Sequence, residues 1–108
     1  MNAEEIRTYC LNKKDAAESF PFGNDTLVYK VKGKIFLLVS LDSVPLQFNV
    51  KCEPDKAIEL REEYPENILP GYHMNKKHWN TIIVDGKIAT KIIKEMMDDS
   101  YKLVSKTK

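Results

Sequence analysis

The sequence predicts a single α+β domain in which helices pack against an antiparallel sheet. Three observations support this. The length, 108 residues, suits one domain with one core. Several short segments alternate apolar and polar residues, which is typical of strands with one solvent-facing side. The last third of the chain repeats apolar residues at helical spacing. The predicted element order is α-β-β-β-α-(β)β-α, in which the bracketed strand has the weakest pattern.

The first predicted element is a helix over residues 2–11. Asn2 suits the N-cap position, and Glu5 stands three residues later, as in a capping box. A Phe-Pro-Phe-Gly segment follows at residues 20–23. Two aromatic residues around a proline, followed by glycine, predict a rigid turn that closes the edge of a core.

Three strands are predicted next, over residues 27–32, 35–41 and 46–51. The first two are separated by a tight turn at Lys32 and Gly33, where glycine can adopt a positive φ. The second is nearly all apolar, which predicts a central strand covered on much of both faces. The third alternates strictly, as expected for a sheet with one wet face.

The second half of the chain predicts a helix, a hairpin and a final helix. Pro54 suits the first turn of a helix over residues 55–64. Residues 66–71 are interpreted as a loop, and residues 79–84 as a strand that pairs with a short strand around Tyr72. The final helix is predicted from its apolar stripe, which consists of Ile88, Ile92, Ile93, Met96, Met97, Tyr101 and Val104.

Composition limits the classes of protein to consider. The formal net charge of +1 predicts no general attraction to polyanions, so any nucleic-acid contact depends on where charges lie. Cys10 and Cys52 stand among apolar neighbours and are expected to be reduced, buried thiols. The first residues resemble no signal peptide, and no apolar stretch reaches membrane-spanning length. We therefore expect a cytoplasmic protein with no membrane partner.

Residues 70–80 hold the most unusual composition in the chain. Histidines, lysines, aromatic residues and amides gather there in a predicted turn flanked by strands. Such a segment can contact phosphates through its lysines and stack a base on an aromatic ring. It can equally be ordinary structure, with tryptophan in the core, asparagines bonded to the turn and lysines in solvent. The candidate ligand contacts are Tyr72, His73, Asn75, His78, Trp79 and Asn80.

The same segment does not predict metal or catalytic chemistry. His73 and His78 are five residues apart, and a metal site needs three or four ligands with supporting contacts. Neither histidine has an evident nucleophile or carboxylate partner. The sequence contains no glycine-rich phosphate loop, nucleophile elbow or zinc-ligand spacing. We expect no catalytic residue, no metal and no cofactor, and therefore no enzyme.

Charges are unevenly distributed along the chain. Residues 53–66 hold six acidic and two basic residues, whereas residues 71–94 hold five lysines and one acid. Residues 28–51 hold four lysines and one acid. If the lysines share a face, they form a positive surface despite the balanced total. Solvated lysines that keep sheet edges from pairing are the alternative. The candidate phosphate contacts are Lys30, Lys32, Lys34, Lys76 and Lys77.

A set of short motifs resembles the MmcQ/YjbR family over nearly the whole of residues 1–108. The combination of residues 20–23 with residues 70–80 is the most specific part. The resemblance implies a secretion-chaperone-like or frataxin-like α+β fold and DNA binding through a double-wing arrangement of hairpins. The matching pieces, in the family's order, are residues 20–23, 29–31, 33–36, 50–52, 60–62, 70–80, 100–101 and 103–104.

Two functions follow as hypotheses. The first is a non-enzymatic DNA-binding module that uses basic hairpins to contact phosphates. Arg7 and Arg61 are the only arginines, and neither lies in a predicted hairpin, so we expect weak and largely sequence-independent binding. The second is a protein-interaction or small-ligand-binding module that uses the surface of residues 72–80. A continuous positive face across both hairpins favours the first, and a concave pocket lined by His73, Asn75 and Trp79 favours the second.

Overall fold

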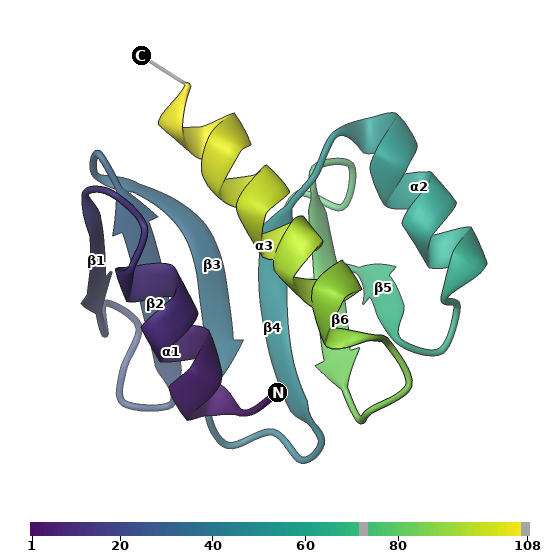
Figure 1. The fold of residues 1–108 in the computed structure, drawn as a ribbon, viewed down its shortest axis with the longest axis horizontal. Coiled ribbons are helices and arrows are strands. Elements are labelled where there is room, and N and C mark those ends of the chain that lie inside the picture. Colours follow the sequence, from purple (N-terminus) through teal and green to yellow (C-terminus); the bar gives the residue numbers. More distant parts are fainter. Residues whose placement is uncertain (72–73, 107–108) are drawn as a thin grey trace.

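A six-stranded antiparallel sheet forms the frame of the protein (Figure 1). The computed structural model describes residues 1–71 and 74–106. The strands lie in the order β1-β2-β3-β4-β6-β5. The elements are α1 (Ala3–Leu11), β1 (Ala16–Ser19), β2 (Thr26–Val31), β3 (Lys34–Ser40), β4 (Leu46–Lys51), α2 (Pro54–Glu63), β5 (Ile68–Pro70), β6 (Trp79–Val84) and α3 (Thr90–Ser105).

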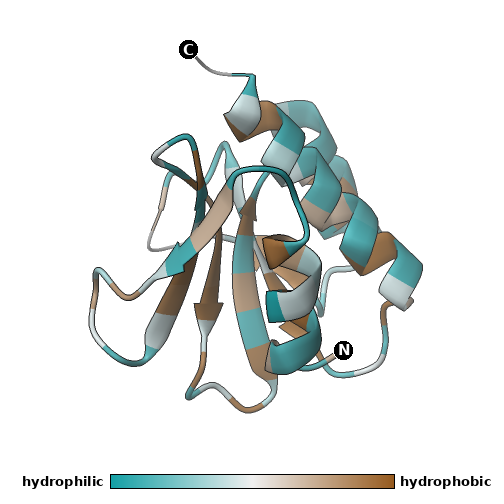
Figure 2. Cartoon of the chain, turned by 60° about the vertical axis from the view of Figure 1, so that its left-hand side comes forward, coloured by the Kyte–Doolittle hydropathy of each residue, from teal (hydrophilic) through white to brown (hydrophobic). Residues whose placement is uncertain are grey.

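All three helices pack on one face of the sheet and leave the other face without a helix (Figures 1 and 2). The main core lies between the sheet and the helices, and it includes Phe36, Phe48, Ile82 and Met97. A smaller cluster lies on the opposite side, which we call the helix-free face. The predicted α+β class with an antiparallel sheet and packed helices is confirmed.

The observed element order contains one strand more than predicted. β1 pairs with β2 at the sheet edge, and its sequence of alanines, a glutamate and a serine has little intrinsic preference for a strand. Within residues 66–71, for which the sequence predicts a loop, residues 68–70 form β5, which pairs with β6. The partner strand was predicted around Tyr72, which lies outside the described residues.

The turn between β2 and β3 has the predicted tight geometry. Lys32 and Gly33 both adopt positive φ, 54° and 78°, as required for a type I′ turn that matches strand twist. The register then shifts between Tyr29 and Lys30, so Phe36 has no paired residue on β2. This bulge places Phe36 and Leu37 together in the main core.

The helices form close to where their sequences predict, but α3 begins at Thr90 and leaves Ile88 of the predicted stripe outside the helix, buried in the main core. Asn2 and Glu5 form the complete capping box of α1. On α3, Ile93 and Met96 are buried against the sheet, and α3 contacts the central strand β3. Both cysteines are free and buried. Among the described residues, none of the helices has the length and apolar character needed to span a membrane.

Tyr29 on β2 carries a buried hydroxyl group. Its side chain is fully buried, and the hydroxyl has no hydrogen-bond partner among the described residues. A buried polar group that loses water without a replacement partner costs roughly 1–3 kcal/mol. We therefore expect Tyr29→Phe to raise the free energy of unfolding by about 1 kcal/mol. The measurement is urea denaturation, where the midpoint should rise with an unchanged slope.

Tyr9 provides the matched control for this change. Its hydroxyl donates to both carboxylate oxygens of Asp98, at 2.8 and 2.9 Å. Tyr9→Phe removes a hydrogen bond to a charged group and should lower the free energy of unfolding by about 1–2 kcal/mol. If Tyr29→Phe were destabilised to the same extent, the Tyr29 hydroxyl would have to be hydrogen-bonded in solution.

Candidate nucleic-acid interface

The two basic connections predicted from the sequence meet at one end of the sheet. Because all neighbouring strands are antiparallel, the β2–β3 turn, the end of β4 and the β5–β6 connection lie at the same end (Figure 1). We call this the hairpin end. One strand, β4, separates the two hairpins. Both basic connections therefore lie at the same end of the sheet, on either side of β4.

The candidate lysines all belong to the hairpin end. Lys30, Lys32 and Lys34 lie on or beside the β2–β3 turn, and Lys76 and Lys77 are exposed in the β5–β6 connection. The Lys32 ammonium group also donates to the Ser105 carbonyl at the end of α3, at 3.3 Å.

Lys51 was absent from the sequence-based set of candidate residues. It ends β4 between the two hairpins, and its side chain is on the helix-free face. The sequence-based candidates were lysines in or beside predicted turns, and Lys51 belongs to a regular strand. It adds a positive charge on the strand that lies between the two hairpins.

Backbone hydrogen bonds hold the described part of the β5–β6 connection. The Met74 amide donates to Gly71 at 2.9 Å. The Asn75 carbonyl accepts from both His78 and Trp79, and its side chain accepts from the Lys77 amide at 3.0 Å. Asn75 therefore stabilises the turn that presents the lysines, as the structural interpretation of this segment expected.

Arg61 on α2 holds the same connection from the helix side. Its Nε donates to the Asn80 side chain at 2.7 Å, and its Nη2 donates to the Lys76 carbonyl. Asn80 is 1% exposed and also donates to Ala57 of α2. Asn80 is therefore a structural residue beneath α2, which corrects its selection as a ligand contact. The sequence argument considered lysines in the hairpins, and Arg61 lies outside both of them, on α2.

Trp79 lies on the face opposite Asn80. The residue is 9% exposed and packs in the smaller cluster with Val28 and Leu38. The strand register places Thr81 and Ile83 on the same face. Trp79 therefore anchors the connection to the helix-free face and presents little ring surface for stacking on a base.

Of the other predicted contacts, His78 is half-buried. Tyr72 and His73 lie outside the described residues.

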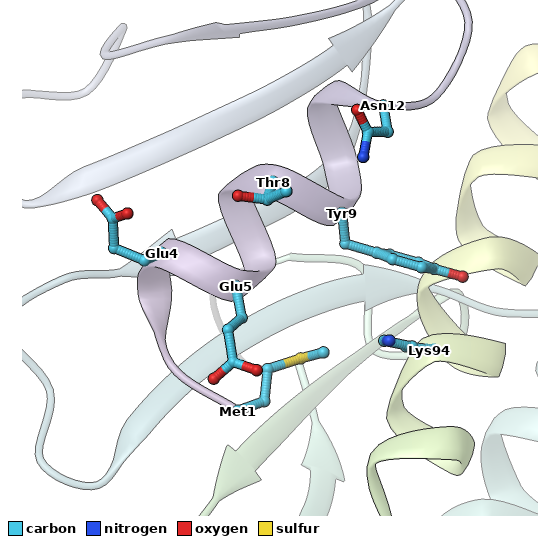
Figure 3. A pocket seen from close by; sticks show the side chains of 7 residues that line it. All are labelled: Met1, Glu4, Glu5, Thr8, Tyr9, Asn12 and Lys94. Atoms are coloured by element: carbon cyan, nitrogen blue, oxygen red, sulfur yellow. The ribbon is translucent and has the colours of Figure 1, made fainter.

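Two hollows differ in character. One, of about 410 Å³, lies between α1 and α3 and is lined by residues such as Glu4, Glu5 and Lys94 (Figure 3). It is on the helix side, away from the predicted contact residues. The other, of about 350 Å³, lies on the helix-free face and includes Met74 of the β5–β6 connection and Phe22 of the β1–β2 loop.

Within residues 1–71 and 74–106, no group of three or more potential ligands could hold a metal ion.

Comparison with known proteins gives consistent matches. A family model described as YjbR matches residues 11–103. The protein YbdF of Escherichia coli O157:H7 is 42% identical over 86 residues, which are 79% of this chain and 69% of that protein. YjbR of Escherichia coli (strain K12) is 29% identical over 101 residues, 94% of this chain and 85% of that protein. The crystal structure of Deinococcus radiodurans protein DR2400, described by the domain DUF419, aligns with a TM-score of 0.94 at 36% identity, covering 98% and 80% of the two chains.

Proposed function

Because the chain belongs to the YjbR family, we propose that it is a non-enzymatic DNA-binding module that contacts phosphates through the hairpin end. The single observation that supports this most is the meeting of both lysine-bearing hairpins at one end of the sheet. The family resemblance implied two such hairpins, and their separation by one strand lets both face a single duplex.

The available charges favour weak binding that does not read sequence. Phosphate contacts give affinity and orientation but carry no base information. Bidentate recognition of guanine is best made by arginine, and Arg61 is engaged with Asn80 and Lys76. Arg7 pairs with Glu18 on the helix side. Lysines therefore supply the contacts, and we expect non-specific dissociation constants of about 10⁻⁴–10⁻⁶ M at physiological salt.

The absence of catalysis is part of the proposal. Burial raises the pKa of Cys10 to about 12, and burial also raises the pKa of Cys52. Both thiols are therefore protonated at neutral pH and are poor nucleophiles. His78, the histidine in the described part of the connection, is half-buried and has no carboxylate partner among the described residues. These features favour a binding module over an enzyme.

The test combines charge reversal with salt dependence. Lys76→Glu with Lys77→Glu should weaken binding to every short duplex by a similar factor, roughly tenfold. The wild-type slope of log affinity against log salt should be roughly −3 to −4, and the variant should flatten it by about two. Fluorescence anisotropy with labelled duplexes of different sequence measures both effects. No binding of the folded wild-type protein at about 50 mM salt would exclude the DNA function.

The matched control reverses two lysines at the opposite end of the molecule. Lys87 follows β6 and Lys91 is the second residue of α3, and both are exposed. The Lys87–Glu66 pair joins two exposed groups, so its loss costs little stability. Lys13 is unsuitable because it pairs with Asp98 and lies over the rings of Tyr9 and Tyr101. An equal loss of affinity in the Lys87→Glu, Lys91→Glu variant would show that the hairpin end has no special role.

A second candidate is a protein-interaction or small-ligand module that uses the surface around the β5–β6 connection. The hollow beside Met74 favours it, because small-ligand sites are concave and mostly apolar with a few polar groups, although Asn75 and Trp79 of the expected pocket are not among its lining residues. A pull-down from lysate with and without nuclease treatment separates the two candidates. Partners that survive nuclease favour the second, and partners that are lost favour DNA.

A further inference from the structure

The helix-free face has a composition that differs from the rest of the surface. Strand register places on it the apolar residues Val28, Ile35 and Leu38, together with hydroxyl and amide side chains. Across all six strands, the charged residues on this face are Lys30 and Lys51. On this face the strands therefore combine apolar side chains with hydrogen-bonding groups and positive charge, and they carry no acidic residue there. Val28 and Leu38 are themselves buried in the smaller cluster, and Ile35 is partly exposed.

A hollow of about 350 Å³ occupies this face between two loops. Ile35 and Leu38 of β3 form its floor. Phe22 comes from the β1–β2 loop and Met74 from the β5–β6 connection, and these loops leave the sheet at opposite ends. The volume is near the lower limit for ligand sites, which are about 300–1,000 Å³. A flat ring can lie on this floor between an aromatic and a thioether side chain, both of which make favourable contacts with rings.

Polar groups line the same hollow. Thr26, Ser40 and Asn49 contribute to its wall. The Asn49 oxygen accepts from the Thr81 hydroxyl, which leaves the amide nitrogen of Asn49 without a described partner. The hydroxyl groups of Thr26 and Ser40 likewise make no hydrogen bond to the described part of the chain. One wall of the hollow can therefore bond the edge of a ring that carries both donors and acceptors.

The positive charges lie on one side of the hollow. Lys30 is directly opposite Ile35 across the β2–β3 pair, and Lys51 is two residues beyond Asn49 on the same face of β4. Both lie on the side of the hollow toward the hairpin end. A ligand that places a ring in the hollow and extends an anion toward the hairpin end would satisfy both features.

These observations match an unpaired nucleotide. We propose that the hollow binds one base of single-stranded DNA, with Phe22 stacking on its face and Asn49 bonding its edge. The adjacent phosphates lie against Lys30 and Lys51 and continue to the hairpin end. This inference rests on the proposed DNA function and adds a preference for single strands, because a paired base is stacked within the duplex and cannot enter the hollow. Phe22 is 66% exposed, which is the state expected of a stacking platform before its ligand arrives.

The test compares one labelled oligonucleotide of about twelve nucleotides as a single strand and as a duplex, at about 50 mM salt. Wild-type protein should bind the single strand more tightly. Phe22→Ala should weaken single-strand binding roughly tenfold, the size of one base–aromatic stack, and leave duplex binding within about twofold. Phe22→Trp should restore the single-strand affinity. Because Phe22 is exposed, folding should persist, and circular dichroism checks it.

The matched control removes an exposed apolar side chain from the helix side. Ile58 on α2 is 50% exposed, and Ile58→Ala should change neither affinity. Equal binding of both probes with no effect of Phe22→Ala would overturn the single-strand inference while the phosphate-binding function stands. No binding of either probe would overturn both. Single-strand binding that depends on Phe22 supports the inference whether or not the duplex binds.

Discussion

Ile93→Asp is expected to unfold the protein or to lower its melting temperature by roughly 20 °C or more. Ile93 is 3% exposed on the face of α3 that packs against the sheet. The change removes a packed side chain and buries a carboxylate with no positive partner. Their combined cost is about 4 kcal/mol or more, a large part of the total stability of a domain this size. Thermal denaturation followed by circular dichroism measures the effect.

The stability lost in the Ile93→Asp variant should also depend on pH. Burial disfavours the charged form of the introduced carboxyl group, so its pKa is raised in the folded state. An acid with a raised folded pKa binds its proton more tightly when folded, so the deficit shrinks as pH falls toward about 4. Lys91→Asp is the matched control, because Lys91 is exposed in the first turn of the same helix. It should be neutral or slightly stabilising, since a negative charge suits a helix N-terminus. A wild-type melting temperature in Ile93→Asp would place residue 93 in solvent.

Ser100→Ala is expected to cost about 2–4 kcal/mol, although it removes one oxygen atom. The Ser100 side chain is fully buried on α3. Its hydroxyl donates to the Phe36 carbonyl and accepts from the Lys51 amide, at 2.8 Å for the latter. Phe36 lies in the β3 bulge without a paired residue, and Lys51 extends past the last β3–β4 pair. Alanine would leave both backbone groups buried without a partner.

Two measurements isolate this effect. Urea denaturation should show a lower midpoint, and hydrogen exchange should speed up at the Lys51 amide in particular. Ser105→Ala is the matched control, because that hydroxyl donates to Lys102 in the exposed last turn of α3. Its effect should lie within about 0.5 kcal/mol. If the two serine variants were equally stable, the Phe36 and Lys51 groups would have to find other partners.

Local patterns predicted most elements because each depends on neighbours in the chain. Residues 46–51 and 79–84 match β4 and β6, and the capping box of α1 formed as expected. β1 and β5 were missed because neither carries a strong local signal. β1 gains its hydrogen bonds from β2, and β5 gains them from β6. Strand formation at a sheet edge depends on the partner, which is distant in sequence.

The sequence by itself determined the α+β class, the core-facing side of α3, the reduced cysteines and the lysines of the two hairpins, because periodicity and composition are local properties. Tertiary structure alone decided which of these groups meet. It brought both hairpins to one end of the sheet, and it turned Asn80 inward to Arg61 while Trp79 faces the other side. It also formed the hollow on the helix-free face from two loops and three strands. The physical reason is that strand order and register, which no single segment encodes, determine which side chains share a surface.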